Sequence, residues 1–169
     1  MDYSAAPKIP MSSPDLGEAE REAVLQVLST NYLSMGPFIR DFEQAFRDFT
    51  GAKHAIAVNS GTAGLHCCVR AAGIGSGDLV LTTPFSFVAS TNVILFEHAI
   101  PIFVDAEPQT GNMDVEQLAQ AADDLAAGGE RAKKWLPNGV TNHGPLKAIL
   151  PVDVFGQPTD YDAINAIAK

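Results

Sequence analysis

The residues best suited to binding chemistry form a short segment, residues 59–62 (Asn-Ser-Gly-Thr), between an apolar stretch and a helical pattern. The apolar residues 55–58 predict a strand, and the small residues after the segment predict the first turn of a helix. A helix N-terminus has unpaired backbone N–H groups and the positive end of the helix dipole, which together attract a phosphate. Gly61 allows close approach of the backbone, and Ser60 and Thr62 offer hydroxyl groups. The segment therefore predicts a site that binds an anionic group.

Strand and helix patterns alternate along the chain after residue 54. The expected strands are 55–58, 79–83, 100–104 and 148–152, and the expected helices are 62–72, 88–98, 115–127 and 161–168. Strands that are apolar throughout and alternate with helices predict a parallel sheet covered on both faces. The expected fold class is therefore α/β, a three-layer α/β/α arrangement with a mainly parallel sheet. Ligands of such sheets bind beyond the carboxyl ends of the strands, where residues 59–62 are expected.

The N-terminal part of the chain has a different pattern. Residues 1–13 predict an extended arm, because prolines at positions 7 and 10 disfavour a helix. An amphipathic helix is expected to begin near Asp15, which with Glu18 has the spacing of a capping box. After a loop at 31–37, a second helix has four phenylalanines at helical spacing, which favours packing in a core, and Gly51 predicts its end. These phenylalanines are Phe38, Phe42, Phe46 and Phe49.

Residues 128–144 interrupt the alternation with charge, glycine and no clear period. They predict a surface excursion, in which Trp135 either packs locally or contacts a partner chain. The sequence ends at Lys169 inside a helical pattern, without a closing strand. The expected organisation is therefore an arm at 1–13 followed by the N-terminal part of a domain at 14–169, with its C-terminal part absent.

Charge and composition exclude some classes of function. The net charge of -9 and the pI of about 4.7 argue against a general binder of nucleic acid or of anionic membranes. The sequence has no signal-peptide pattern and no stretch long enough to span a membrane, which favours the cytoplasm. Adjacent Cys67 and Cys68 suit neither a disulfide nor a metal pair and are expected to be buried in a helix. The four histidines are scattered, so no metal site is expected.

Six segments occur in an order that resembles the N-terminal part of one family. They are NYLSMGP, FEQAFRDFTGAKHAIAVNSGTAGLH, GIGSGD, TTPFSFVASTNVI, PIFVDAEPQTGNMD and LKAILPVDVFGQPTDYDAI. The chain is similar to the DegT/DnrJ/EryC1/StrS family, the sugar aminotransferases of fold type I that depend on pyridoxal 5'-phosphate (PLP). The resemblance implies part of a PLP-transferase large domain and a homodimer. It also implies an amino donor and a keto-sugar substrate, expected to be nucleotide-linked.

The resemblance also implies roles for individual residues. The segment Ser60, Gly61 and Thr62 corresponds to the cradle of the cofactor phosphate, in agreement with the interpretation from the turn. Phe87 corresponds to an aromatic residue that stacks on the pyridine ring, and Phe85 is the alternative if the turn is offset by one residue.

Two other places in the family pattern bear on the substrate cleft. Tyr32 and Ser34 lie where relatives line this cleft, and an ordinary interface loop is the alternative. Asp153 stands where many relatives have histidine, and a solvated or capping carboxylate is expected there.

No catalytic residue is assigned within the chain. In the family, the lysine that forms the Schiff base and the aspartate that pairs with the pyridine nitrogen lie beyond the position of residue 169. The 169 residues alone are therefore expected to be inactive, although the parent protein is expected to be an enzyme.

Alternative functions remain open at the level of sequence. A PLP-dependent sugar dehydratase and a non-catalytic regulator share the fold, and a non-catalytic interaction domain is a further alternative. A Rossmann oxidoreductase domain is a weaker alternative, because Gly73, Gly75 and Gly77 follow a helix and precede a strand. The dinucleotide fingerprint has the opposite order.

Overall fold

The computed structural model describes residues 12–169. The predicted arm at 1–13 therefore lies almost wholly outside the described residues. The chain divides into two compact units, Met1–Ala57 and Val58–Lys169.

The described residues of the first unit, 12–57, contain two helices, α1 (Glu18–Leu28) and α2 (Pro37–Thr50). The helix predicted near Asp15 is present, but the capping box predicted for Asp15 and Glu18 is wrong, because Gly17 occupies the N-cap and its N–H donates to Glu20 Oε2 at 2.6 Å. Proline suits the first turn of α2, since its missing N–H would have no partner there. Gly51 ends α2 as predicted, with a left-handed φ of 72° that glycine adopts without strain.

The aromatic stripe of α2 does not form a core in this structure. Its four phenylalanines are all exposed, from 37% at Phe38 to 89% at Phe49. Neither α1 nor α2 has a buried residue, because two helices have too little surface to enclose side chains from water. The prediction of core packing for this stripe is therefore wrong.

The strand predicted at 55–58 is also absent. These residues form no β-ladder, and the N–H of Ala57 instead donates to Glu43 Oε1 at 2.9 Å. A strand requires a neighbouring strand for its backbone groups, and an apolar run alone does not supply one.

The second unit contains a three-stranded parallel sheet in the order β2-β1-β3. The strands are β1 (Leu79–Thr82), β2 (Ile100–Phe103) and β3 (Leu146–Leu150). The last strand begins two residues earlier than predicted. The helices of this unit are α3 (Gly61–Ala71), α4 (Ala89–Phe96), α5 (Val115–Ala127), α6 (Gly129–Lys133) and α7 (Tyr161–Ile167), with a 3-10 turn, η1, at Val154–Gly156.

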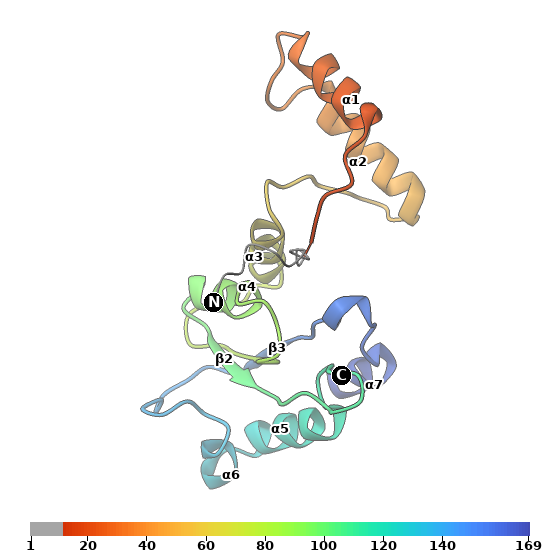
Figure 1. Cartoon of the computed structure of the whole chain (residues 1–169). Helices are drawn as coiled ribbons and strands as arrows, with labels where there is room; N and C mark the ends of the chain where they lie inside the picture. The colour runs from red at the N-terminus through yellow and green to blue at the C-terminus, as the bar shows by residue number, and fades with distance from the viewer. Residues whose placement is uncertain (1–11) are drawn as a thin grey trace, which may run out of the picture. The chain divides into compact units, whose positions relative to one another are not determined.

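Helices cover both faces of the sheet, so the predicted α/β fold class with its three layers is confirmed for this unit (Figure 1). Leu79 and Leu81 pack with α5, α6 and α7, whereas Val80 packs with α3 and α4. The central strand is buried on both faces, which explains why its sequence is apolar without alternation. On α3 only Val69 is buried, and the two cysteines are exposed and free, so the expectation that they are buried is wrong.

The excursion at 128–144 is anchored to α5 by one buried carboxylate. Asp124 is 2% exposed; it accepts a hydrogen bond from Trp135 Nε1 at 3.0 Å and pairs with Lys134 Nζ at 2.6 Å and Arg131 Nε at 2.7 Å. The hydrogen bond from Lys134, followed by that from Trp135, holds the pKa of Asp124 well below its ordinary value. Of the two roles predicted for Trp135, the structure shows local packing.

Candidate functional site

A pocket of about 560 Å³ lies where the chain leaves β1 and β3, next to the beginning of α3. We call it the α3 pocket. Its lining residues are Gly61, Thr62, Leu65, Ser86, Phe87, Ala89, Ser90, Leu150, Pro151, Val152, Asp153 and Tyr161. This is the position that parallel-sheet topology predicts for a ligand, beyond the carboxyl ends of the strands.

The N-terminus of α3 presents two unpaired donors to this pocket. Ser60 is the N-cap, and its hydroxyl oxygen accepts from the N–H of Ala63 at 3.1 Å, while its carbonyl accepts from Gly64. Within residues 12–169, no hydrogen bond involves the N–H of Gly61 or of Thr62. A Cβ added at Gly61 would meet no atom within 4 Å, so space remains in front of this backbone.

Three of the four residues predicted to bind the cofactor line this one pocket. They are Gly61, Thr62 and Phe87. Ser60 does not line it, because its hydroxyl faces the helix backbone as a cap. The assignment of all four to a cofactor stays a prediction.

The structure distinguishes the two aromatic candidates. Phe87 is 79% exposed and borders the α3 pocket, whereas Phe85 does not line it and contacts Phe155 edge-to-face, with ring centroids 6.0 Å apart. Hydroxyl groups fix the turn that carries Phe87. Ser90 is buried, and its hydroxyl donates to Ser86 Oγ at 2.8 Å and lies 3.1 Å from the carbonyl oxygen of Phe87.

A carboxylate and a phenol form another part of the wall. Asp153 Oδ1 accepts from the N–H of Thr159 at 3.0 Å and from the hydroxyl of Tyr161 at 3.1 Å, and this hydroxyl also lies 3.1 Å from Oδ2. Asp153 is exposed, which fits the expected solvated carboxylate, but its side chain makes no cap hydrogen bond to η1, so the alternative of a capping role is not observed. Sequence reasoning missed Tyr161, and the signal that could have found it is its place as the first residue of the helix after the strand and turn.

A second pocket, of about 340 Å³, adjoins the first and shares Ser86, Phe87, Val152 and Asp153 with it. We call it the aromatic hollow. Its other lining residues are Pro84, Phe85, Val154 and Phe155. The two pockets together follow the edge of the sheet from α3 to η1.

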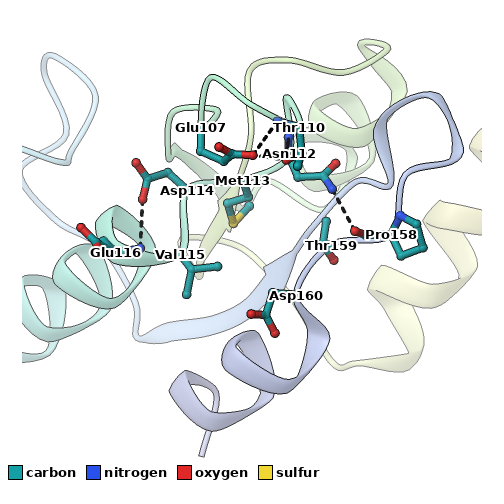
Figure 2. Close-up of a pocket in the computed structure, with 10 residues that line it drawn as sticks. All are labelled: Glu107, Thr110, Asn112, Met113, Asp114, Val115, Glu116, Pro158, Thr159 and Asp160. Carbon is teal, nitrogen blue, oxygen red and sulfur yellow. Dashed lines mark hydrogen bonds between the residues drawn. The ribbon is translucent and has the colours of Figure 1, made fainter.

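A third pocket, of about 500 Å³, lies between residues 107–116 and 158–160 (Figure 2). Its carboxylates have structural partners. Asp114 caps α5 through the N–H groups of Glu116 and Gln117, and Asp160 caps α7 through Ala163. Glu107 accepts hydrogen bonds from Thr110 and Gln109; the bond from the Thr110 hydroxyl is the main cause that lowers its pKa. We therefore regard this cluster as part of the fold.

The remaining predicted residues lie elsewhere. Tyr32 and Ser34 are exposed in the loop between α1 and α2, and their contact with a substrate stays a prediction. Gly73, Gly75 and Gly77 lie between α3 and β1, an order that does not match a dinucleotide fingerprint.

Three kinds of feature are not found among residues 12–169: a lysine in the wall of the α3 pocket, a cluster of metal ligands and a membrane-spanning helix. No lysine of the second unit lines the α3 pocket. Residues 12–169 contain no group of three or more histidines, cysteines or carboxylates placed to hold a metal ion. No helix there is long and apolar enough to cross a bilayer.

Comparisons with known proteins identify the relatives of the chain. The model of the DegT/DnrJ/EryC1/StrS aminotransferase family matches residues 14–169. The chain is 38% identical over 161 residues to the spore coat polysaccharide biosynthesis protein SpsC of Bacillus subtilis, covering 95% of this chain and 36% of SpsC. It is 36% identical over 167 residues to GDP-perosamine synthase of Caulobacter vibrioides, covering 98% of this chain and 40% of that enzyme.

A solved structure of an aminotransferase is also similar to the chain. Spr1654 of Streptococcus pneumoniae in its PLP-form superimposes with a TM-score of 0.75 and 27% identity, covering 94% of this chain and 36% of that chain. The chain thus spans between about a third and two fifths of the length of the proteins it matches.

Proposed function

The chain belongs to the DegT/DnrJ/EryC1/StrS aminotransferase family, and we propose that the whole protein is a PLP-dependent aminotransferase acting on a keto sugar, expected to be nucleotide-linked. The names of two relatives, GDP-perosamine synthase and a spore coat polysaccharide biosynthesis protein, support a sugar as the substrate class. The PLP-form of Spr1654 supports the cofactor.

One observation in this chain carries the proposal. The N–H groups of Gly61 and Thr62 have no partner among the described residues, and they line the same pocket as the exposed ring of Phe87. Free amides at the start of an 11-residue helix suit a phosphate, and an aromatic side chain suits the face of a flat pyridine ring. The residues present therefore fit both ends of PLP.

In this proposal, the residues of this chain bind the cofactor and orient its ring. When bound, PLP supplies an electron sink for the transfer of the amino group. Gly61 and Thr62 hold the phosphate, and Phe87 restrains the ring from one side. No lysine of the second unit lines the pocket, so these residues are assigned no proton transfer.

We also propose that the protein acts as a homodimer in the cytoplasm. The exposed apolar side chains of α2 support self-association, because contiguous apolar surface of this kind marks interaction sites. The acidic composition is compatible with a cytoplasmic enzyme that uses small molecules. Sedimentation of the purified protein and fractionation of cells test these two points.

The test of the function uses the full-length protein and the visible absorbance of bound PLP. We expect saturable binding of PLP and a spectral change when glutamate is added. Gly61→Ala adds a methyl group in open space, so it leaves the fold intact and obstructs the phosphate. Gly75→Ala also adds a methyl group in open space, outside the pocket, and serves as the control.

Each result has a defined meaning. Weaker PLP binding in Gly61→Ala but not in Gly75→Ala supports the proposal. Wild-type affinity in Gly61→Ala, or no binding of PLP by the wild-type protein, contradicts it. Binding of PLP without any response to amino donors or keto sugars would instead favour the dehydratase or the regulator.

A further inference from the structure

The aromatic hollow beside the α3 pocket has features that the cofactor does not use. Phe85 and Phe155 line it, and both lie outside the α3 pocket. The side chain of Phe155 is 95% exposed, so its aromatic surface is open to contact. The hollow therefore presents aromatic surface to whatever enters from the adjoining pocket.

The turn that carries Phe155 is held in place by Asn112. Its Nδ2 donates to the carbonyl oxygens of Gln157 at 3.1 Å and Pro158 at 3.0 Å, and its Oδ1 accepts from the N–H of Val154 at 3.2 Å. Phe155 itself has a left-handed φ of 53°, a conformation that costs energy in a bulky residue. The fold thus keeps a residue with an exposed aromatic ring in a strained backbone conformation.

The ring of Phe85, which contacts Phe155, is positioned by the backbone of Gly111. A Cβ at Gly111 would lie 3.1 Å from Phe85 Cε1, so only glycine permits this close approach of backbone and ring. The left-handed φ of 76° at Gly111 requires the same residue type. Phe85 therefore meets Phe155 edge-to-face, at an angle of 76° between the ring planes.

One carboxylate stands at the junction of the two pockets. Asp153 lines both of them, and the N–H of Thr159 and the hydroxyl of Tyr161 orient it. Among residues 12–169, the one hydrogen bond to Oδ2 is the shared contact with the Tyr161 hydroxyl at 3.1 Å, so this oxygen retains the capacity to accept another. A fixed, accepting carboxylate selects a hydroxyl or ammonium donor and repels a second anion.

We propose that the aromatic hollow is the subsite for the sugar ring of the substrate, with Asp153 as the residue that determines its specificity. The apolar C–H face of the ring packs on Phe155, and a ring hydroxyl donates to Asp153 Oδ2. The shared wall of the two pockets places this ring next to the proposed cofactor. The inference rests on the proposed function for the identity of the occupant as a sugar.

The experiment titrates the full-length protein, labelled with 13C in its phenylalanine rings, with methyl β-glucoside and with glucuronate as NMR probes. We expect saturable shifts of the Phe85 and Phe155 resonances with the neutral glucoside and weaker binding of the anionic glucuronate. Asp153→Asn keeps an acceptor for Thr159 and removes the charge. It should weaken glucoside binding at least about tenfold, as loss of a charged hydrogen bond does, and reduce the preference over glucuronate.

Further variants separate recognition from folding. Phe155→Ala removes an exposed ring and should abolish glucoside binding. Phe155→Trp keeps an aromatic ring at this position and should retain binding. Asp162→Asn and Phe96→Ala are matched controls, because both residues are exposed and line neither pocket. Both controls should bind the glucoside as the wild-type chain does.

Defined results would overturn the inference. If the resonances of Phe85 and Phe155 do not shift when the glucoside is added, the inference is wrong. This result is expected if another segment of protein fills the hollow. Equal glucoside affinity in Asp153→Asn, or ring shifts with adenosine but not with the glucoside, would also overturn the inference. PLP titration of the wild-type protein and of the Phe155 variants is an independent measurement, because Phe155 lies outside the α3 pocket. Glucoside binding without PLP binding would therefore contradict the proposed function alone.

Discussion

Replacement of Asn112 by alanine tests whether one side chain holds the site turn in place. Asn112 is 5% exposed and makes three hydrogen bonds to the backbone of residues 154–158. Each such bond stabilises a protein by about 1 kcal/mol net, so Asn112→Ala should lower the free energy of unfolding by about 3 kcal/mol. For a chain of this length, that loss lowers the melting temperature by about 6–12 °C.

Urea and thermal unfolding followed by circular dichroism measure this change. The matched control is Asn138→Ala in the exposed part of the excursion, which should change stability by less than about 0.5 kcal/mol. The same variant should lose the ring shifts of Phe155 that the glucoside induces, because the turn is no longer fixed. A loss below about 0.5 kcal/mol in Asn112→Ala would refute the argument that this side chain organises the turn.

Three further predictions concern other parts of the second unit. Leu118→Ala on α5, where the leucine is fully buried, should destabilise by about 2–5 kcal/mol in urea unfolding, while Leu95→Ala on exposed surface should cost far less. Asp124→Asn should release the excursion, seen as faster proteolytic cleavage within 128–144 and a red shift of the emission of Trp135, the only tryptophan; unchanged cleavage would contradict the anchor. Because its folded pKa is lowered, Asp124 contributes stability fully above its ordinary pKa of 3.8 and loses it as the pH falls through the lower folded value. Trp135 emission in the wild-type chain should therefore stay constant from neutral pH down to about pH 4 and change only in stronger acid, and a transition near neutral pH would contradict this assignment.

The bounds of a helix were predictable from the sequence where residues at its two ends favour a cap and a stop. The helix expected at 115–127 is observed with the same bounds, because Asp114 caps its first turn and Gly128 follows its last residue. The class of sheet was predictable as well, since the central strand is apolar on both faces. In both cases the information lies within a few consecutive residues.

Features that depend on distant partners were not predictable in the same way. Residues 55–58 have the composition of a strand, yet strand formation requires a neighbour that the apolar pattern does not specify. The different positions of Phe85 and Phe87 are another example: Phe87 lines the α3 pocket, whereas Phe85 lies against the backbone of Gly111, which is far from it in the sequence. The pairing of Asp153 with Tyr161 passes through a turn with a left-handed Phe155, a conformation that residue preference argues against.

The order of strands in the sheet has a consequence for how the second unit forms during synthesis. β1 lies between its two partners, and pairing with β2 closes a loop that contains only α4. Pairing with β3 closes a much longer loop, which also contains α5, α6 and the excursion. Because closure of a long loop costs more entropy, the β1–α4–β2 portion should assemble on the ribosome first. One edge of β1 then stays unpaired until β3 has been synthesised.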